Sequence, residues 1–92
     1  MTEADGLAAI FSCMADPTRL SVLLTLLEGE RCVCDLSEET GASVSSVSHG
    51  LRLLRAGGLV SRRRDGRHMY YRLADHHVEA LLRTAIEHLE HL

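Results

Sequence analysis

The sequence predicts a mainly α-helical domain with one β-hairpin, the arrangement of a winged helix-turn-helix. Two observations support this fold: a pair of short helical patterns joined by a Gly-containing turn, and a pair of strand-like segments that follows at once. With 92 residues, of which 46% are hydrophobic, the chain can bury a modest core. Because no repeat, low-complexity stretch or linker interrupts it, we expect a single domain over residues 1–92.

Two helices are expected in the N-terminal third of the chain. Residues 7–14 place apolar side chains at helical spacing. Asp16 can cap a second helix, because its carboxylate accepts a backbone N–H, and Pro17 fits the first helical position. Leucine and valine then recur at helical spacing until Gly29, where this helix should end.

The third and fourth predicted helices form the helix-turn-helix. The third helix runs from about Val33 to Thr40 and ends at Gly41. Ser43 caps the fourth helix, whose apolar stripe continues to Gly57 and Gly58. Two helices joined by so tight a turn are typical of this motif.

A β-hairpin is expected directly after these glycines. Residues 59–64 and 67–73 have the composition of strands and flank Asp65-Gly66. This dipeptide favours a two-residue type I′ turn, in which both central residues take positive φ angles. The hairpin supplies the wing.

The charge of the chain is unevenly distributed. The formal net charge is only −3, but all ten basic residues are arginines, and seven of them lie between Leu51 and Leu73, where Asp65 is the only acid. Arginine forks suit contacts with phosphates and with guanine edges. The fourth helix and the wing are therefore the candidate DNA-binding surface, although a run of charge can also be a solvated face.

In a winged helix the second helix of the motif enters the major groove and the wing follows the backbone or minor groove. The polar face of the fourth helix and the arginines of the wing are the predicted contacts: Ser45, Ser46, Ser48, His49, Arg52, Arg62, Arg63, Arg64 and Arg67. Gly50, inside the fourth helix, is expected either to let DNA approach closely or to relax sequence reading.

The C-terminal residues include metal ligands that lie too far apart in a single chain to bind one ion together. In a helix over residues 78–92, His77 and His88 are 11 residues apart, roughly 16 Å along the axis. One zinc ion with Zn–N bonds of about 2 Å cannot reach both. A second copy packed antiparallel would bring its His88 and His91 beside Asp75 and His77 of the first. The spacing therefore predicts a symmetric dimer with two identical sites.

Three cysteines in an uneven arrangement do not form a disulfide framework, so we expect reduced thiols. Cys13 is interpreted as a small packed side chain. Cys32-x-Cys34, with Asp35 beside it, is a second candidate metal site, although two thiolates alone leave it incomplete.

Several of these segments together resemble the ArsR/SmtB family of metal-sensing repressors, and the resemblance covers nearly the whole chain. The resemblance rests on Cys32-Val33-Cys34-Asp35-Leu36, the run Ser43-Val44-Ser45-Ser46-Val47-Ser48-His49, Leu59-Val60 after the two glycines, Gly66-Arg67-His68 with Tyr70-Tyr71, and Asp75-x-His77 with His88-x-x-His91.

The resemblance implies a homodimer, built from the N- and C-terminal helices, that binds operator DNA when metal-free and releases it when metal binds. It assigns a terminal-helix site to Asp75 and His77 of one protomer with His88 and His91 of the other. One carboxylate and three imidazoles suit zinc, with cobalt as a close mimic. It further implies a bond from His88 to a backbone carbonyl near Gly58.

The residues are also compatible with other functions. A sensor of arsenite, cadmium or lead would use Cys32 and Cys34 instead, and a zinc-binding dimer without a regulatory role would bind metal equally with or without DNA. A winged-helix protein-interaction module is a third alternative. An enzyme is not expected, because four protein ligands leave zinc no position for water or substrate.

The N-terminal residues are acidic and the apolar runs are short, so we expect a cytoplasmic protein without a membrane segment.

Overall fold

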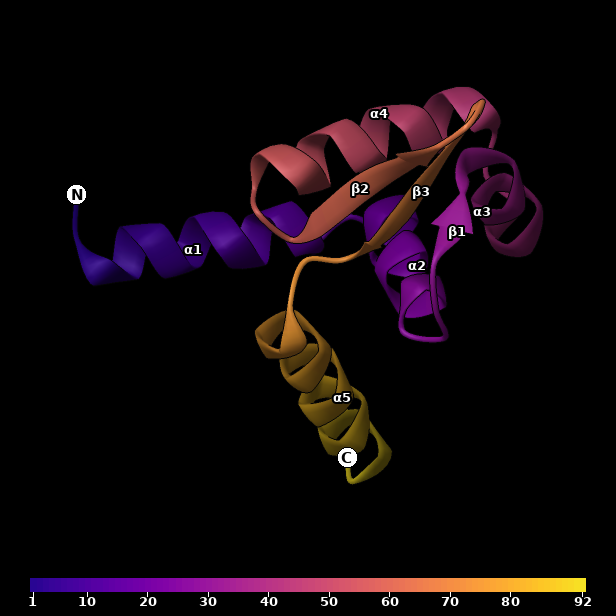
Figure 1. Cartoon of the computed structure of the whole chain (residues 1–92). Coiled ribbons are helices and arrows are strands. Elements are labelled where there is room, and N and C mark those ends of the chain that lie inside the picture. The colour runs from indigo at the N-terminus through magenta and orange to yellow at the C-terminus, as the bar shows by residue number, and fades with distance from the viewer.

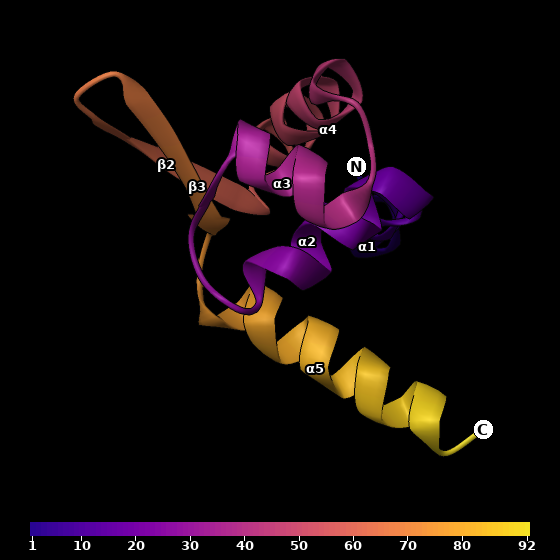
Figure 2. The same cartoon turned by 90° about the vertical axis from the view of Figure 1, so that its right-hand side faces the viewer.

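The computed structural model describes residues 1–92 and consists of five helices and a three-stranded sheet, whose long hairpin projects beyond the helices (Figures 1 and 2). The elements in chain order are α1 (Glu3–Met14), α2 (Pro17–Leu26), β1 (Arg31–Cys32), α3 (Val33–Thr40), α4 (Val44–Ala56), β2 (Val60–Asp65), β3 (His68–Leu73) and α5 (His76–Glu90). The predicted winged helix-turn-helix is confirmed, with α3 and α4 as the motif and β2–β3 as the wing.

The core lies where α2, α3 and α4 pack together against the base of the sheet. The apolar stripe of α4 buries Val47, Leu51 and Leu54, which recur at helical spacing and face the buried Leu23 and Leu36 of the two preceding helices. The core is completed by Met14, Val22, Leu26, Leu59, Val60, Tyr71, Val78 and Leu82. This packing fixes the orientation of α4 and therefore of its exposed face.

The predicted helix caps at Asp16 and Ser43 are confirmed. The Asp16 carboxylate accepts the backbone N–H of Arg19 at 3.0 Å, and the Ser43 hydroxyl accepts that of Ser46 at 3.0 Å. The helix α1 begins four residues earlier than expected, because Thr2 starts it through a reciprocal pair of hydrogen bonds with its N3 residue. The helix α2 ends at Leu26, three residues before Gly29.

The predicted type I′ turn at Asp65-Gly66 is wrong. Asp65 is the last residue of β2 and pairs with His68, so the two loop residues are Gly66 and Arg67. Gly66 has a φ of 62°, whereas no residue other than glycine has a positive φ. A positive φ only at the first loop position, occupied by glycine, is the pattern of a type II′ turn.

A third strand, β1, was not expected from the sequence. Its two residues pair antiparallel with β3, Arg31 opposite Tyr71 and Cys32 opposite Tyr70, which gives the strand order β1-β3-β2. Two residues are too few to show the alternating pattern from which strands are recognised. The strand nevertheless matters for the site, because it holds the segment around Glu30 beside the wing.

The helices α1 and α5 extend away from the rest of the molecule (Figures 1 and 2). Only Val78 and Leu82 of α5 are buried, and large apolar side chains of α1, among them Leu7 and Phe11, remain exposed. The helix α5 spans His76–Glu90 rather than the expected 78–92, because its N-cap is Asp75. No single helix is long and apolar enough to cross a membrane; α1 and α2 together meet that length and composition, but with a bend of 85°.

Candidate nucleic-acid interface and metal centre

The ten arginines of the chain divide into two equal groups by their contacts. Five have a hydrogen-bond or ion-pair partner: Arg19 with the Cys13 carbonyl, Arg31 with Glu39, Arg63 with Glu30, Arg72 with Ser61 and Arg83 with Glu79. The other five, which have no such partner, all lie on α4 or the wing: Arg52, Arg55, Arg62, Arg64 and Arg67. The basic surface that the sequence predicts is therefore also where the arginines without a partner in the chain gather.

The predicted contact residues of α4 lie on its solvent face. Ser45, Ser48, His49 and Arg52 are all exposed. Ser46 is exposed as well, and its hydroxyl accepts a hydrogen bond from the Ser43 hydroxyl at 3.0 Å, within the helix cap. This face is polar and projects away from the core, as a helix that enters a groove requires.

Gly50 lies where α4 contacts α2, a role that was not expected from the sequence. It is buried, and a Cβ atom added there would lie 3.3 Å from Cγ of Arg19. The Arg19 side chain crosses this point and donates from Nε to the Cys13 carbonyl at 2.7 Å. The glycine therefore makes room for the contact between α2 and α4, and it lines an open hollow with Ser46 and His49, two of the predicted DNA contacts. Its effect on DNA reading stays a prediction.

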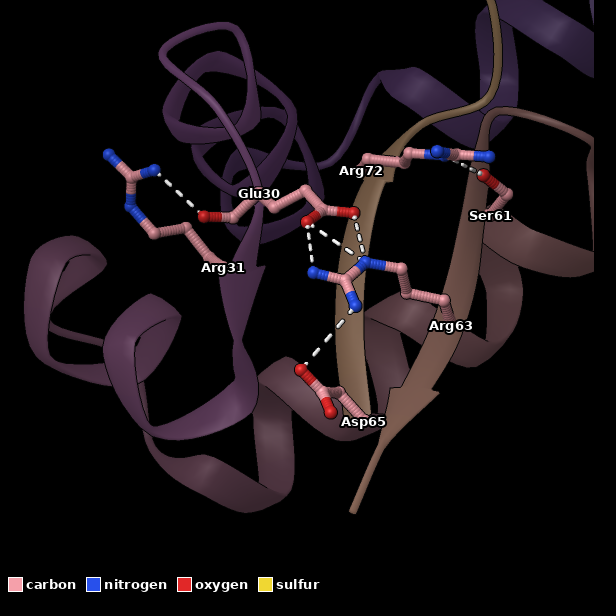
Figure 3. Close-up of polar contacts among 6 residues, drawn as sticks. All are labelled: Glu30, Arg31, Ser61, Arg63, Asp65 and Arg72. Carbon is pink, nitrogen blue, oxygen red and sulfur yellow. Dashed lines mark hydrogen bonds and ion pairs between the residues drawn. The ribbon is translucent and has the colours of Figure 1, made fainter. Parts of the chain in front are cut away.

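Arg63 differs from the other wing arginines because a carboxylate already binds it. Its Nε and Nη2 atoms donate to the two Glu30 oxygens at 2.9–3.1 Å (Figure 3). Its guanidinium carbon lies 5.0 Å from the centre of the Tyr70 ring, and Asp65 is 3.8 Å away. This hydrogen bond lowers the pKa of Glu30 and keeps the carboxylate charged. Arg63 thus braces the wing against the segment before β1.

Asp75 and His77 lie together at the start of α5. Oδ1 of Asp75 accepts the backbone N–H groups of His77 at 2.9 Å and of Val78 at 3.1 Å. These bonds, that of Val78 first, lower the pKa of Asp75. The His77 side chain is 78% exposed, with Nδ1 3.6 Å from Oδ1. The pair therefore offers an ionised carboxylate, whose Oδ2 takes no part in the cap, and an accessible imidazole. His76, the neighbouring histidine, is exposed.

His88 and His91 lie at the other end of α5, on one exposed face. They line a shallow hollow with Thr84 and Glu87. Glu87 is a candidate ligand that was missed from the sequence, although its spacing to the two histidines places all three on one helix face. No three His, Cys, Asp or Glu side chains of the single chain are grouped so that they could hold a metal ion.

Asp75 and His77, one half of the predicted metal site (a half-site), lie near the end of α4, the recognition helix that is expected to enter the major groove. Asp75 and His77 line a hollow together with Gly57, Gly58 and Leu59, which directly follow α4. The remaining lining is apolar and comes from α1 and α5: Ile10, Val78 and Leu81. A group that binds in this hollow would contact both the metal half-site and the end of α4.

The three cysteines are free thiols. Cys13 is half-buried between α1 and α4, where its thiol lies 3.6 Å from the Leu53 carbonyl and a Cβ atom on Gly57 would meet it at 3.0 Å. These contacts agree with the interpretation of Cys13 as a packed side chain. Cys32 is half-buried and Cys34 exposed, and with Asp35 they do not form a three-ligand group in the single chain.

Comparison with known proteins identifies the family. Residues 16–62, from the cap of α2 into β2, match the family described as bacterial regulatory protein, arsR family. The chain belongs to the arsR family. Its sequence is 47% identical, over 90 residues, to the transcriptional repressor SmtB homolog of Synechocystis, covering 98% of this chain and 68% of that protein. It is 40% identical over 82 residues to the cadmium resistance transcriptional regulatory protein CadC homolog of Staphylococcus aureus, covering 88% and 68%.

The fold of this ArsR-family chain also matches a solved structure. It superimposes with a TM-score of 0.85 and 38% identity on a homodimeric winged helix-turn-helix DNA-binding domain from Mycobacterium bovis, covering 97% of this chain and 86% of that one. The expected partners, double-stranded DNA and a second copy, are thereby confirmed at the level of the family. The match to the family model ends within β2, so the histidines of α5 require an argument of their own.

Proposed function

We propose that this chain is a homodimeric transcriptional repressor that binds operator DNA when metal-free and is released by zinc, or by cobalt as a mimic. The zinc would bind between the subunits, at Asp75 and His77 of one protomer with His88 and His91 of the partner subunit. The observation that carries the proposal is the placement of two exposed half-sites at opposite ends of α5. Neither half can hold a metal ion by itself.

An antiparallel arrangement of two α5 helices would complete two such sites. The exposed apolar side chains of α1, Leu7 and Phe11, together with Leu89 of α5 offer the surface that a second copy would bury. Asp75 keeps Oδ2 free while Oδ1 caps the helix, and His77, His88 and His91 are all exposed. Three imidazoles and one carboxylate match the ligands that zinc prefers in four-coordinate sites, and zinc would supply a link between the two subunits.

The hollow beside Asp75 and His77 suggests how metal binding reaches the DNA surface. A histidine of the partner subunit that enters it would contact Gly57 and Gly58 as well, at the end of the recognition helix. A bond from His88 of the partner subunit to a carbonyl there would orient the ligand and favour one position of α4. If DNA and zinc prefer different dimer arrangements, an ordinary coupling of about 1–3 kcal/mol changes DNA affinity roughly 5- to 150-fold.

A thiolate sensor is the main alternative. Cys34 is exposed, Cys32 lies in β1 beside the wing, and the CadC homolog is named for cadmium resistance. Arsenite, cadmium or lead bound by Cys32, Cys34 and Asp35 would need a further ligand, which this chain does not place there.

A zinc-binding dimer without a regulatory role is the second alternative, and the five unpaired arginines of α4 and the wing argue against it.

Cobalt binding to the dimer tests which side chains hold the metal. We expect one cobalt ion per protomer, with the visible absorption of a four-coordinate site and without the intense near-ultraviolet absorption of cobalt–thiolate bonds. The double variant Cys32→Ser/Cys34→Ser should give the same spectrum and stoichiometry. Thiolate absorption that disappears in this variant would assign the metal to Cys32 and Cys34 and contradict the α5 site.

Two substitutions of Asp75 separate its role as helix cap from its role as ligand. Asn caps helices as well as Asp, so Asp75→Asn should leave the stability of the dimer nearly unchanged while weakening zinc binding roughly 10-fold or more, because the charged oxygen is lost. Asp75→Ala should lose zinc affinity and also about 1 kcal/mol of stability. Competition with a zinc-binding dye and thermal unfolding measure the two effects. Equal zinc affinity of the wild type and Asp75→Asn would restrict Asp75 to capping.

A further inference from the structure

We propose that a cleft between the recognition helix and the wing binds one phosphate group of the DNA backbone, with Arg55 as a contact residue. The cleft is lined by Ser48, Leu51, Arg52, Arg55, Arg62 and Tyr71. The proposal rests on the DNA-binding part of the proposed function and is independent of zinc. Arg55 was counted in the basic region of the sequence but was not among the predicted contacts, and the structure places it half-buried near the end of α4.

The geometry of two elements brings these side chains together. Residues 48, 52 and 55 follow one another at helical spacing, so they share the face of α4 that borders the wing. Arg62 of β2 and Tyr71 of β3 are directly opposite each other in the ladder, so their side chains lie on one face of the sheet. Arg63 and Tyr70, the next pair, lie on the other face, where Glu30 is bound. On one face of the wing Arg63 is therefore paired with a carboxylate, whereas Arg62 on the other face has no partner.

The charges of the cleft call for an anion. Arg52, Arg55 and Arg62 all line it, none has a hydrogen bond or ion pair, and no carboxylate is among the lining residues. Three positive charges that share a cleft repel one another, and an anion between them relieves this repulsion. One guanidinium group can bind two phosphate oxygens through two parallel hydrogen bonds. The hydroxyls of Ser48 and Tyr71 add further polar contacts.

DNA is the source of phosphate that the position of the cleft favours. The cleft lies between the exposed face of α4, which carries the predicted groove contacts, and β2, which carries the free arginines of the wing. A phosphate bound by Arg55 of α4 and Arg62 of β2 would tie the wing to the recognition helix. Buried Tyr71, which is 9% exposed, and Leu51 give the cleft a fixed floor, so its arginines are better positioned than those at the tip of the wing.

The substitution Arg55→Gln tests the proposal on the metal-free dimer. Fluorescence anisotropy with the promoter fragment and with an unrelated duplex, over a series of salt concentrations, measures affinity and its salt dependence. We expect affinity to fall by a similar factor for both duplexes, and the slope of log affinity against log salt to become shallower by about 1, because one phosphate contact is lost. Arg83→Gln, which removes an arginine paired with Glu79 on α5, is the control and should leave both values unchanged.

An unchanged affinity and slope in Arg55→Gln would overturn the proposal. A loss confined to the promoter fragment, without a change in slope, would do so too, because it would assign Arg55 to reading a base. Thermal unfolding of the variant excludes misfolding, and Arg55→Lys, which keeps the charge but not the fork, should keep the slope and lose part of the affinity.

A titration of the free protein with inorganic phosphate, followed by nuclear magnetic resonance of the arginine side chains, tests the cleft without DNA. We expect the Nε–H signals of Arg52, Arg55 and Arg62 to shift together, with the Arg83 signal as reference. Shifts of equal size for all arginines would indicate a general salt effect and contradict a built site. If zinc failed to release DNA while these shifts occurred, the sensing proposal would fail and the cleft would stand.

Discussion

Replacing His88 by Gln is expected to abolish zinc-driven release while leaving metal-free DNA binding close to that of the wild type. The His88 side chain is exposed and far along α5 from the DNA surface, so its loss should disturb neither the fold nor the arginines. It supplies a zinc ligand in the proposed site, and it is also the group that would enter the hollow beside Gly57 and Gly58 of the partner subunit. Both the metal affinity and the coupling should therefore fall.

The measurement is fluorescence anisotropy of labelled operator DNA bound to the dimer, as zinc is added. The wild type should lose affinity roughly 5- to 150-fold, the range of an ordinary allosteric coupling, and His88→Gln should lose almost none. His76→Gln is the matched control, because His76 is an exposed histidine of the same helix that the proposed site does not use. Release of His88→Gln by zinc at the wild-type concentration would contradict the role of His88.

The double substitution Arg62→Gln/Arg64→Gln is expected to cause the largest loss of DNA affinity. Both arginines lie on the same face of β2, because side chains two residues apart in a strand point the same way, and neither has a partner in the chain. Loss of two phosphate contacts should reduce the salt slope by about 2, and affinity at moderate salt should fall roughly 10- to 100-fold.

Arg63→Gln is the matched control for the wing, because it removes the same charge from the position between them. Glu30 already neutralises Arg63, so the loss of Arg63 should weaken DNA binding much less than the double substitution does. The change in salt slope should also be much smaller than in the double variant. The two variants are compared by anisotropy in one salt series. If Arg63→Gln were the more damaging of the two, the division of the wing into a paired and a free face would be wrong as an account of DNA binding.

The helix boundaries could be predicted where a local signal sets them. Asp16 and Ser43 each cap a helix through a hydrogen bond to a residue three positions on, which is a property of the local sequence. The strand β1 could not be predicted, because it exists only through pairing with residues of β3 about 40 positions later. The hairpin turn was misplaced by one residue, because the dipeptide Asp65-Gly66 does not by itself reveal which residue ends the ladder.

The features of the candidate site likewise fall into those that the local sequence predicts and those that depend on distant residues. The spacing of His88 and His91 on α5, and the distance from them to Asp75 and His77, follow from helix geometry, so the sequence could predict that one copy does not bring these side chains together. Which arginines are free was not, because the partner of Arg63 is Glu30, 33 residues earlier in the chain. Likewise, the buried position of Gly50 depends on Arg19, a residue of another helix.

Zinc-driven release from operator DNA can be measured by a zinc titration of the metal-free dimer already bound to its own promoter fragment, followed by fluorescence anisotropy. We expect release at about one zinc ion per protomer, unchanged in Cys32→Ser/Cys34→Ser and absent in His88→Gln. Release that depends on the cysteines, or that only arsenite, cadmium or lead produces, would move the sensing site to Cys32 and Cys34. Zinc binding without any change in DNA affinity would contradict a regulatory role for the α5 site.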